Sequence, residues 1–353
     1  LNNGLRAQLG QVAKSKNAMK TWLILFPFLP KPSTIDHRPS FQGHKTNYNM
    51  TPAFQTVLPK LLSAPPFFLI AGPCVLESLH STLTTAEKLR QMSENLNLPI
   101  VFKASFDKAN RQSSHSYRGP GLDQGLEMLD QVKQQFGQGK NGLLITTDCH
   151  EAHQASMVCQ VADIIQIPAL LCRQTDLIEA AAQTGCTVNI KKGPFASPNT
   201  MLLAAEKVKH IQHSMCTTKE PPFDNGTTVL LTERGTFFGY DDLVFDPRNA
   251  VRMRTPNTLV VQDVTHSVQS SGGGRDGHSS SGDRDLIPTI ARAAVAVGVD
   301  GLFFETHENP DQAKCDGANQ WPVDDLEELM KELIDIGTVT KGRRRRREEE
   351  DDT

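Results

Sequence analysis

A single cysteine directly after a short apolar run is the first residue of this chain that could do chemistry. Cys74 follows the apolar stretch at 67–70 and a Gly72-Pro73 break. A thiol in this position can be small core filler, half of a disulfide, a nucleophile or a metal ligand. The chain has 7 cysteines, an odd count, and no two of them form a Cys-x-x-Cys pair. This count favours free thiols in a reducing compartment over a disulfide framework.

A second group of chemically interesting residues is positively charged. Lys103, Lys108 and Arg111 stand close together in the sequence, and further cations are Arg173, Lys191, Lys192 and Arg234. Arginine binds phosphate or carboxylate bidentately and lysine acts as a point charge, so converging cations suit substrates with several anionic groups. The simpler interpretation of any one of them, such as Lys108, is a surface cation paired with a nearby acid.

Eight short apolar segments alternate with stretches that are compatible with helices. The segments cover residues 67–72, 99–105, 142–149, 163–169, 187–193, 228–235, 259–266 and 301–307. Continuous apolar strands separated by helices indicate a parallel sheet covered by helices. Eight such units in about 250 residues predict an α/β fold, a single-domain (β/α)8 TIM barrel. A doubly wound sheet is the alternative, but no Gly-x-Gly-x-x-Gly follows the first segment.

The apolar segments end in polar or ionisable residues. These residues are Cys74, Lys103, Asp148, Gln166, Lys191, Glu233 with Arg234, Asp263 with His266, and Glu305. In a barrel, the carboxyl ends of the strands meet at one mouth, where active sites lie. The simpler alternative is that polar residues only mark where strands stop. Because so many of them fall on one rim, we expect a functional site there.

Composition excludes some classes of function and separates the barrel from its flanks. With 38% hydrophobic residues, 22% charged residues and a net charge of −3, the chain gives no electrostatic argument for nucleic-acid binding. No apolar run reaches the roughly 18 residues that span a bilayer. We predict a barrel domain over 60–337, a disordered charged tail over 338–353, and a segment 1–50 outside the fold. The Gly/Ser-rich stretch 267–285 is a floppy insertion or a lid over the mouth.

The segment 1–50 leaves the cellular location open. Its first part is mildly basic and lacks acids, which is the bias of an organelle transit peptide, although the chain begins with Leu rather than Met. The segment is therefore either a transit peptide or upstream sequence. We predict a cytoplasmic protein, or a plastid protein if the segment is a transit peptide.

Several long motifs carry a resemblance to a known family. They include AGPCVLES at 71–78, VFKASFDKANR at 101–111, NIKKGPF at 189–195, ERGTFFGYDDL at 233–243 and DGANQWP at 316–322. Together with DVTHS at 263–267, they resemble the 3-deoxy-D-manno-octulosonate 8-phosphate synthases, over roughly residues 67–336. The resemblance implies that phosphoenolpyruvate condenses with D-arabinose 5-phosphate and water, giving the eight-carbon sugar phosphate and inorganic phosphate. It also implies a homotetramer.

The resemblance also assigns roles to individual residues. Phosphoenolpyruvate would be held by Lys103, Lys108, Arg173, Lys191 and Arg234. Arabinose 5-phosphate would contact Asn110 and Arg111, Asp148 would face its hydroxyls, and Gln166 would line the floor. Ser105 and His266 complete the predicted substrate-binding set, and the residues expected to take part in catalysis are Lys103, Lys108, Asp148 and His266.

A metal site is implied by the same resemblance. In the metal-dependent branch of the family, Cys74 would be joined as ligands by His266, Glu305 and Asp316. One thiolate, one imidazole and two carboxylates suit a divalent ion such as Zn²⁺, Fe²⁺ or Mn²⁺. The metal-independent branch has asparagine in place of the cysteine, so the alternative is that Cys74 is a neutral replacement.

Two other functions compete with this interpretation. A sister family makes the heptulosonate 7-phosphate from erythrose 4-phosphate, but it has Lys-Pro-Arg where this chain has Lys108-Ala109-Asn110-Arg111. A barrel that binds sugar phosphates without turnover would be expected to have lost some of its cations or ligands.

Overall fold

The computed structural model describes residues 54–62, 66–111, 115–215, 229–237, 243–270 and 281–351. All of them belong to one compact unit, Met50–Thr353. The predicted segment 1–50 lies outside the described residues, so its assignment stays a prediction.

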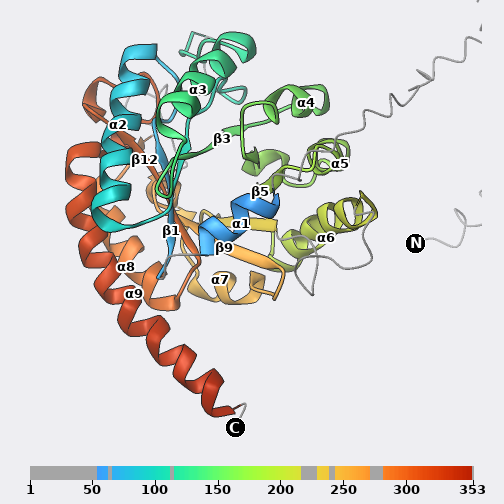
Figure 1. Cartoon of the computed structure of the whole chain (residues 1–353), viewed down its shortest axis with the longest axis vertical. Coiled ribbons are helices and arrows are strands. Elements are labelled where there is room, and N and C mark those ends of the chain that lie inside the picture. Colours follow the sequence, from blue (N-terminus) through green and yellow to red (C-terminus); the bar gives the residue numbers. More distant parts are fainter. Residues whose placement is uncertain are drawn as a thin grey trace, which may run out of the picture. The chain divides into compact units, whose positions relative to one another are not determined.

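Eight parallel strands close into a barrel (Figure 1). In hydrogen-bonded order they are β1 (Phe68–Gly72), β2 (Ile100–Lys103), β3 (Leu144–Asp148), β4 (Ile164–Ile167), β5 (Thr187–Lys191), β6 (Val229–Glu233), β9 (Thr258–Asp263) and β12 (Gly301–His307). The barrel closes because β1 pairs in parallel with β12 as well as with β2. Each of the eight predicted segments contains or overlaps one of these strands, which confirms the (β/α)8 fold.

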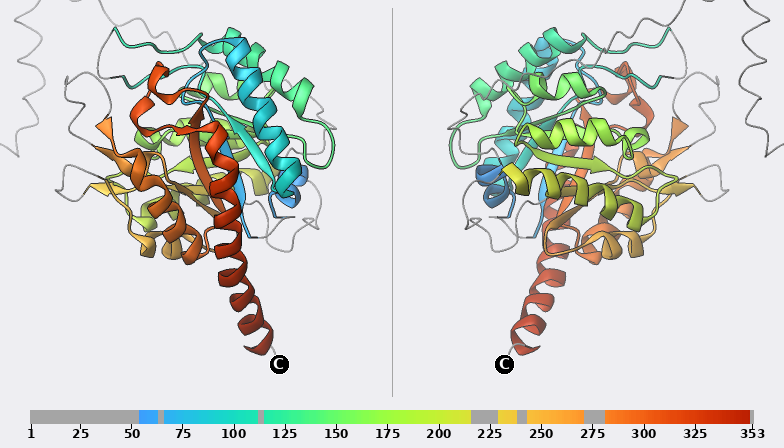
Figure 2. Two further views of the ribbon diagram at one scale, coloured as in Figure 1. Left: turned by 90° about the vertical axis from the view of Figure 1, so that its left-hand side faces the viewer. Right: turned by 90° about the vertical axis from the view of Figure 1, so that its right-hand side faces the viewer.

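Helices connect the strands and cover the outside of the barrel (Figure 2). They are α2 (Leu79–Leu96), α3 (Leu122–Phe136), α4 (Ala155–Val158), α5 (Thr175–Gln183), α6 (Pro198–Met215), α7 (Pro247–Met253), α8 (Ile287–Val297) and α9 (Val323–Asp351). Local sequence sets their ends. Ser78 caps α2 by accepting a hydrogen bond from the Ser81 amide, and Gly298 ends α8 in the left-handed conformation.

The barrel interior changes from apolar to polar along the strands. Successive side chains of a strand point to opposite faces, so every second residue faces the interior. Near the amino ends these residues are apolar, and Val57 and Leu61 of α1 (Phe54–Leu62) pack in the same cluster as Phe68, Val101 and Phe303. Near the carboxyl ends they are polar or charged. The strands therefore build an apolar floor under a polar mouth.

Short strands lie at the carboxyl end of the barrel. β7 (Thr236–Phe237) pairs with β8 (Leu243–Val244), and β13 (Trp321–Pro322) adds to the end of β12. β10 (Gln269–Ser270) pairs with β11 (Ser281–Gly282), so these two strands flank residues 271–280 of the predicted insertion, which lie outside the described residues.

The C-terminal segment differs from the sequence-based expectation. The composition predicts a disordered tail from residue 338, but α9 continues as helix to Asp351. Arg and Glu have high helix propensity, so a block of them can extend a helix that begins within the packed barrel. Among the described residues, no helix is long and apolar enough to span a membrane.

Candidate active site

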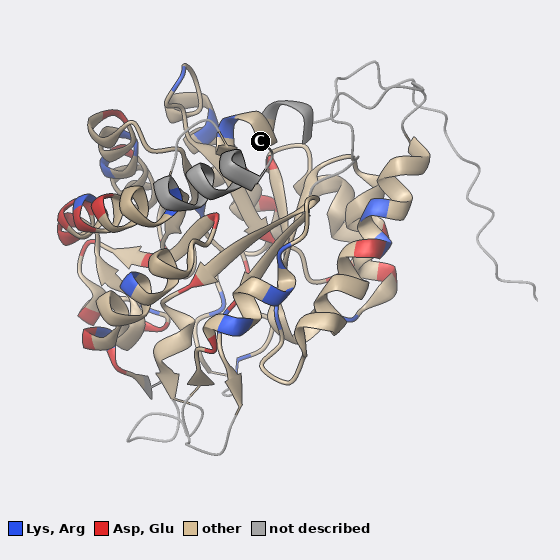
Figure 3. Cartoon of the chain, turned by 90° about the horizontal axis from the view of Figure 1, so that it is seen from below, with Lys and Arg blue, Asp and Glu red and all other residues tan. Residues whose placement is uncertain are grey.

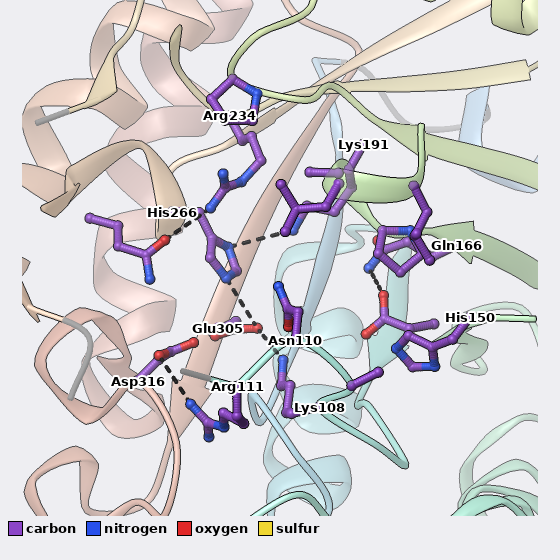
Figure 4. Close-up of a pocket in the computed structure, with 18 of the residues that line it drawn as sticks. Lys108, Asn110, Arg111, His150, Gln166, Lys191, Arg234, His266, Glu305 and Asp316 are labelled. Carbon is purple, nitrogen blue, oxygen red and sulfur yellow. Dashed lines mark hydrogen bonds and ion pairs between the residues drawn. The ribbon is translucent and has the colours of Figure 1, made fainter. Parts of the chain in front are cut away.

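The carboxyl ends of the strands surround a cavity of about 650 Å³. This volume lies in the usual range for small-molecule sites. Most of the predicted site residues line the cavity: Lys103, Lys108, Asn110, Arg111, Asp148, Gln166, Lys191, Arg234, His266, Glu305 and Asp316. Figure 4 shows how those that it labels, such as Lys108, Lys191 and His266, point into the cavity. The same cavity is therefore bordered by cations, acids and an imidazole from separate strands.

Lys103 lies at the centre of one group of charges. Its Nζ lies 3.3 Å from Glu305 Oε1 and 3.7 Å from Asp148 Oδ2, and it donates a hydrogen bond of 2.9 Å to Ser105 Oγ. Lys108 Nζ lies 3.6 Å from the same oxygen of Glu305. Burial alone would raise the pKa of both carboxyls, but the neighbouring cations outweigh it and hold each pKa well below its usual range. Both acids are therefore ionised at neutral pH.

A second group fixes the ring of His266. Asp263 Oδ2 lies 2.7 Å from His266 Nδ1 and 2.5 Å from Lys191 Nζ. This contact turns the other ring nitrogen, Nε2, toward Glu305 Oε1 at 3.7 Å (Figure 4). Burial lowers the pKa of Lys191 below its ordinary value, even though Asp263 works in the opposite direction.

Arg234 has a different environment from the other cations. Its Nη2 donates a 3.0 Å hydrogen bond to Gln269 Oε1, a neutral group. Among the described residues, no carboxylate forms an ion pair with Arg234, and burial lowers its pKa. A half-buried guanidinium beside a neutral partner favours an anionic ligand, because a charge that is partly withdrawn from water and has no ion-pair partner is costly.

The residues predicted to hold a metal come together on one side of the cavity. Cys74 Sγ lies 3.3 Å from Asp316 Oδ2. Ligand atoms of Cys74, Cys315 and Asp316 lie within 4.8 Å of one another, and so do those of His266, Glu305 and Asp316. Glu305 Oε2 is buried and makes no hydrogen bond with the described residues. This oxygen and the mixed sulfur, nitrogen and oxygen donors fit a divalent metal ion.

Backbone geometry explains how Cys74 and Asp316 reach this place. Gly72 has φ +154°, and a Cβ there would lie 2.1 Å from the Lys103 carbonyl oxygen, so only glycine lets β1 approach β2 this closely. Gln320 accepts a hydrogen bond of 3.4 Å from the Cys74 amide and donates one of 2.8 Å to the Cys315 carbonyl. Asp316 has the left-handed conformation at φ 47°, which is rare for a residue other than glycine and is typical of functional sites.

Some predicted residues lie elsewhere. Cys74 and Ser105 are buried behind the lining, where Ser105 donates a short hydrogen bond to Asp148. Arg173 is exposed and does not line the cavity of this chain, so the structure does not bring it to the other cations. Lys192 is also outside the lining, because successive side chains alternate, and it pairs instead with buried Glu233 at 3.4 Å.

Sequence reasoning also missed contributors to the site. His150 lines the cavity, its ring lies 5.6 Å from the Phe106 ring, and burial lowers its pKa. It follows Asp148 by two residues, so the rule of strand ends could have found it. Cys315 and Gln320 reach the site from the segment after β12, and no local sequence pattern predicts that they lie there.

A closed parallel barrel whose cations, imidazole and acids surround one cavity defines a (β/α)8 enzyme for anionic substrates. The DAHP synthetase I family matches residues 63–341, and the chain belongs to that family.

Curated relatives agree with one another. The chain is 50% identical over 288 residues to 2-dehydro-3-deoxyphosphooctonate aldolase 1 of Arabidopsis thaliana, covering 81% of this chain and 93% of the relative. It is 49% identical over 288 residues to the 2-dehydro-3-deoxyphosphooctonate aldolase of Pisum sativum, with the same coverage. The enzyme of that name from Laribacter hongkongensis is 46% identical over 278 residues, covering 79% of this chain and 93% of the relative.

Proposed function

We propose that this protein condenses phosphoenolpyruvate with D-arabinose 5-phosphate and water, forming 3-deoxy-D-manno-octulosonate 8-phosphate and inorganic phosphate. The observation that carries the proposal is the set of cations from separate strands around one cavity. Lys103, Lys108, Arg111, Lys191 and Arg234 all line it. Two substrates with two phosphates and a carboxylate need several such cations, and the names of the curated relatives support this assignment.

The cations divide between the two substrates. We assign phosphoenolpyruvate to the side with Lys103, Lys191 and Arg234, where the half-buried guanidinium beside Gln269 favours an anion. Arabinose 5-phosphate then lies toward Asn110 and Arg111, with its hydroxyls facing Asp148. Arg173 is exposed and has no part in this assignment.

The reaction joins the methylene carbon of phosphoenolpyruvate to the aldehyde carbon of the sugar. Water adds its oxygen at the neighbouring carbon, the bond from that carbon to the phosphate oxygen breaks, and phosphate leaves. Fixed cations stabilise negative charge on the departing phosphate, and a rigid barrel rim holds the two carbons in line for attack. His266, held at Nδ1 by Asp263, presents Nε2 to the cavity.

A divalent ion belongs to this proposal. Cys74, His266, Glu305 and Asp316 would hold Zn²⁺, Fe²⁺ or Mn²⁺, with Cys315 as a neighbouring donor. Such an ion would supply Lewis acidity for the aldehyde or orient the attacking water.

Metal analysis tests this part of the proposal. We expect about one divalent ion per chain, and loss of activity on exhaustive chelation. Cys74→Ser should lower metal content and rate, whereas Cys74→Asn should lack the metal and keep some activity that chelator does not affect. Cys172→Ser, which alters a buried thiol away from the cavity lining, serves as the control. A fully active, metal-free wild type would rule out the metal role.

Product analysis tests the reaction itself. The protein should consume phosphoenolpyruvate and arabinose 5-phosphate in equal amounts, and release phosphate in the same amount. In water labelled with ¹⁸O, the label should enter the sugar product, because water supplies its new oxygen. Label in the released phosphate alone would contradict the proposed bond cleavage, and binding without consumption would indicate a non-catalytic barrel.

A further inference from the structure

Two cysteines outside the cavity lie against each other. Cys159 follows α4 directly, and Cys186 directly precedes β5. Cys186 Sγ lies 3.9 Å from the Cys159 carbonyl oxygen and 3.6 Å from the Ala162 carbonyl oxygen. Cys159 Sγ in turn donates to the Ser156 carbonyl oxygen at 3.6 Å, and each thiol is the largest single influence on the pKa of the other. Neither residue lines the cavity, so the proposed reaction does not use them.

The environments of the two thiols differ. Cys159 is partly exposed, whereas Cys186 is only 3% exposed. The hydrogen bond from Cys186, assisted by one from Thr184, lowers the pKa of Cys159 to about 7. The same contact, together with burial, raises the pKa of Cys186. Cys159 is therefore the more accessible and more readily ionised thiol of the pair, and Cys186 is the protonated thiol behind it.

The surrounding backbone holds this pair in place. Gln212 Nε2 donates a 2.8 Å hydrogen bond to the Cys186 carbonyl, and the Cys186 amide donates one of 3.1 Å to Thr184 Oγ1. Thr184 Oγ1 in turn donates to the Ala181 carbonyl at 2.6 Å. A fixed, buried thiol beside a partly exposed and more acidic thiol is the arrangement of a resolving and an attacking cysteine.

We propose that Cys159 and Cys186 form a peroxide-reactive dithiol that closes to a reversible disulfide. The Cys159 thiolate attacks hydrogen peroxide, so an S–O bond forms, the O–O bond breaks, and hydroxide leaves to take up a proton. The Cys186 sulfur then attacks the Cys159 sulfenic acid, so the S–S bond forms and water leaves. The two thiols lose two electrons in total, and the peroxide is reduced to water. A small dithiol reductant restores both thiols.

Cys74 offers a comparison with Cys159 within the same protein. Cys74 also lies beside a second thiol, that of Cys315, but Cys74 is fully buried, so peroxide in solution has little access to it. Limited peroxide should therefore oxidise Cys159 before Cys74.

The experiment treats the reduced full-length protein with limiting hydrogen peroxide and maps its peptides without reduction. We expect a peptide joining Cys159 to Cys186, which dithiothreitol separates again. Because the cross-link closes a loop between residues 27 apart, the oxidised protein should unfold at a higher temperature. Alkylation of Cys159 in the reduced protein should reach half its maximal rate near pH 7.

Three variants separate the roles. Cys186→Ser should leave a sulfenic acid on Cys159 that a dimedone probe labels, and Cys159→Ser should form no cross-link to Cys186. Cys172→Ser should cross-link like the wild type. If peroxide oxidises Cys159 in the wild type while Cys186 stays free, the proposal is wrong. It is equally wrong if Cys159 reacts no faster than Cys74. Both results come from the wild-type protein, so they hold even if a variant fails to fold.

Discussion

Arg234 is the cavity cation whose surroundings most clearly favour an anionic ligand. It lines the cavity, and its guanidinium donates a hydrogen bond to the neutral side chain of Gln269. We predict that Arg234→Ala lowers kcat/KM by roughly 10- to 150-fold, because one charge-assisted contact contributes about 1.5–3 kcal/mol. The control is Arg292→Ala, which removes an exposed cation paired with Glu332 and should leave the rate unchanged. Near-normal turnover by Arg234→Ala would show that the assignment of phosphoenolpyruvate to this side is wrong.

The burial of His150 leads to a prediction about how the stability of the fold depends on pH. Burial lowers its pKa in the folded protein, so the unfolded chain takes up a proton on this residue at a higher pH than the folded protein does. The stability that neutral His150 contributes is present above about pH 6.5, the usual pKa, and declines as pH falls toward the folded value. Urea unfolding at pH 7.5 and pH 5 should therefore show a smaller loss of stability in His150→Gln than in the wild type. An equal loss in both proteins would contradict the buried, neutral state.

At the scale of elements, one chain of hydrogen bonds crosses four neighbouring strands beneath the cavity. Thr232 on β6 donates to Asn189 on β5 at 2.7 Å, and Asn189 donates to Gln166 on β4 at 3.1 Å. Gln166 donates to Asp148 on β3 at 2.6 Å. All four side chains are buried. Because ionised Asp148 can only accept, it fixes the orientation of both amides.

This series of hydrogen bonds predicts the effect of replacing Asn189, a residue that we do not place in contact with either substrate. Asn189→Leu should raise the KM for arabinose 5-phosphate roughly 10-fold, because Gln166 loses the partner that orients it toward Asp148. The KM for phosphoenolpyruvate should change little. Thr146→Val is the control. It removes a buried hydroxyl that donates a hydrogen bond to the Ile164 carbonyl and takes no part in the series of hydrogen bonds from Thr232 to Asp148. If the two variants lower stability equally and change both KM values alike, Asn189 has only a structural role.

The same elements show what sequence can and cannot predict. The eight barrel strands were recognisable because each is a continuous apolar run between helices, and their carboxyl ends located most of the cavity. The strands β7, β8, β10, β11 and β13 have two residues each, too few to show any alternation. Lys191 ends β5 and Lys192 follows it directly, and only Lys191 lines the cavity, so composition alone could not say which of the two lysines enters it. Gln320 and Cys315 lie beside Cys74 only because the chain folds back after β12.

Across the described part of the chain, charge is mixed on the helices and concentrated in the cavity. Figure 3 shows Lys and Arg interspersed with Asp and Glu along the helices that it colours, in agreement with the small net charge of −3. Cations are grouped around the cavity, and we attribute this grouping to substrate binding. A cavity of about 650 Å³ fits small anionic substrates rather than a polyanion.

The choice of sugar is the central claim about the whole molecule. The family is named for DAHP synthetase, whereas the curated relatives are named 2-dehydro-3-deoxyphosphooctonate aldolases. Phosphate release from phosphoenolpyruvate, measured with arabinose 5-phosphate and with erythrose 4-phosphate under the same conditions, decides between the two activities. We predict that kcat/KM is at least about 100-fold higher with arabinose 5-phosphate, a difference of roughly 2.7 kcal/mol in transition-state binding. An equal or higher value with erythrose 4-phosphate would contradict the proposed function.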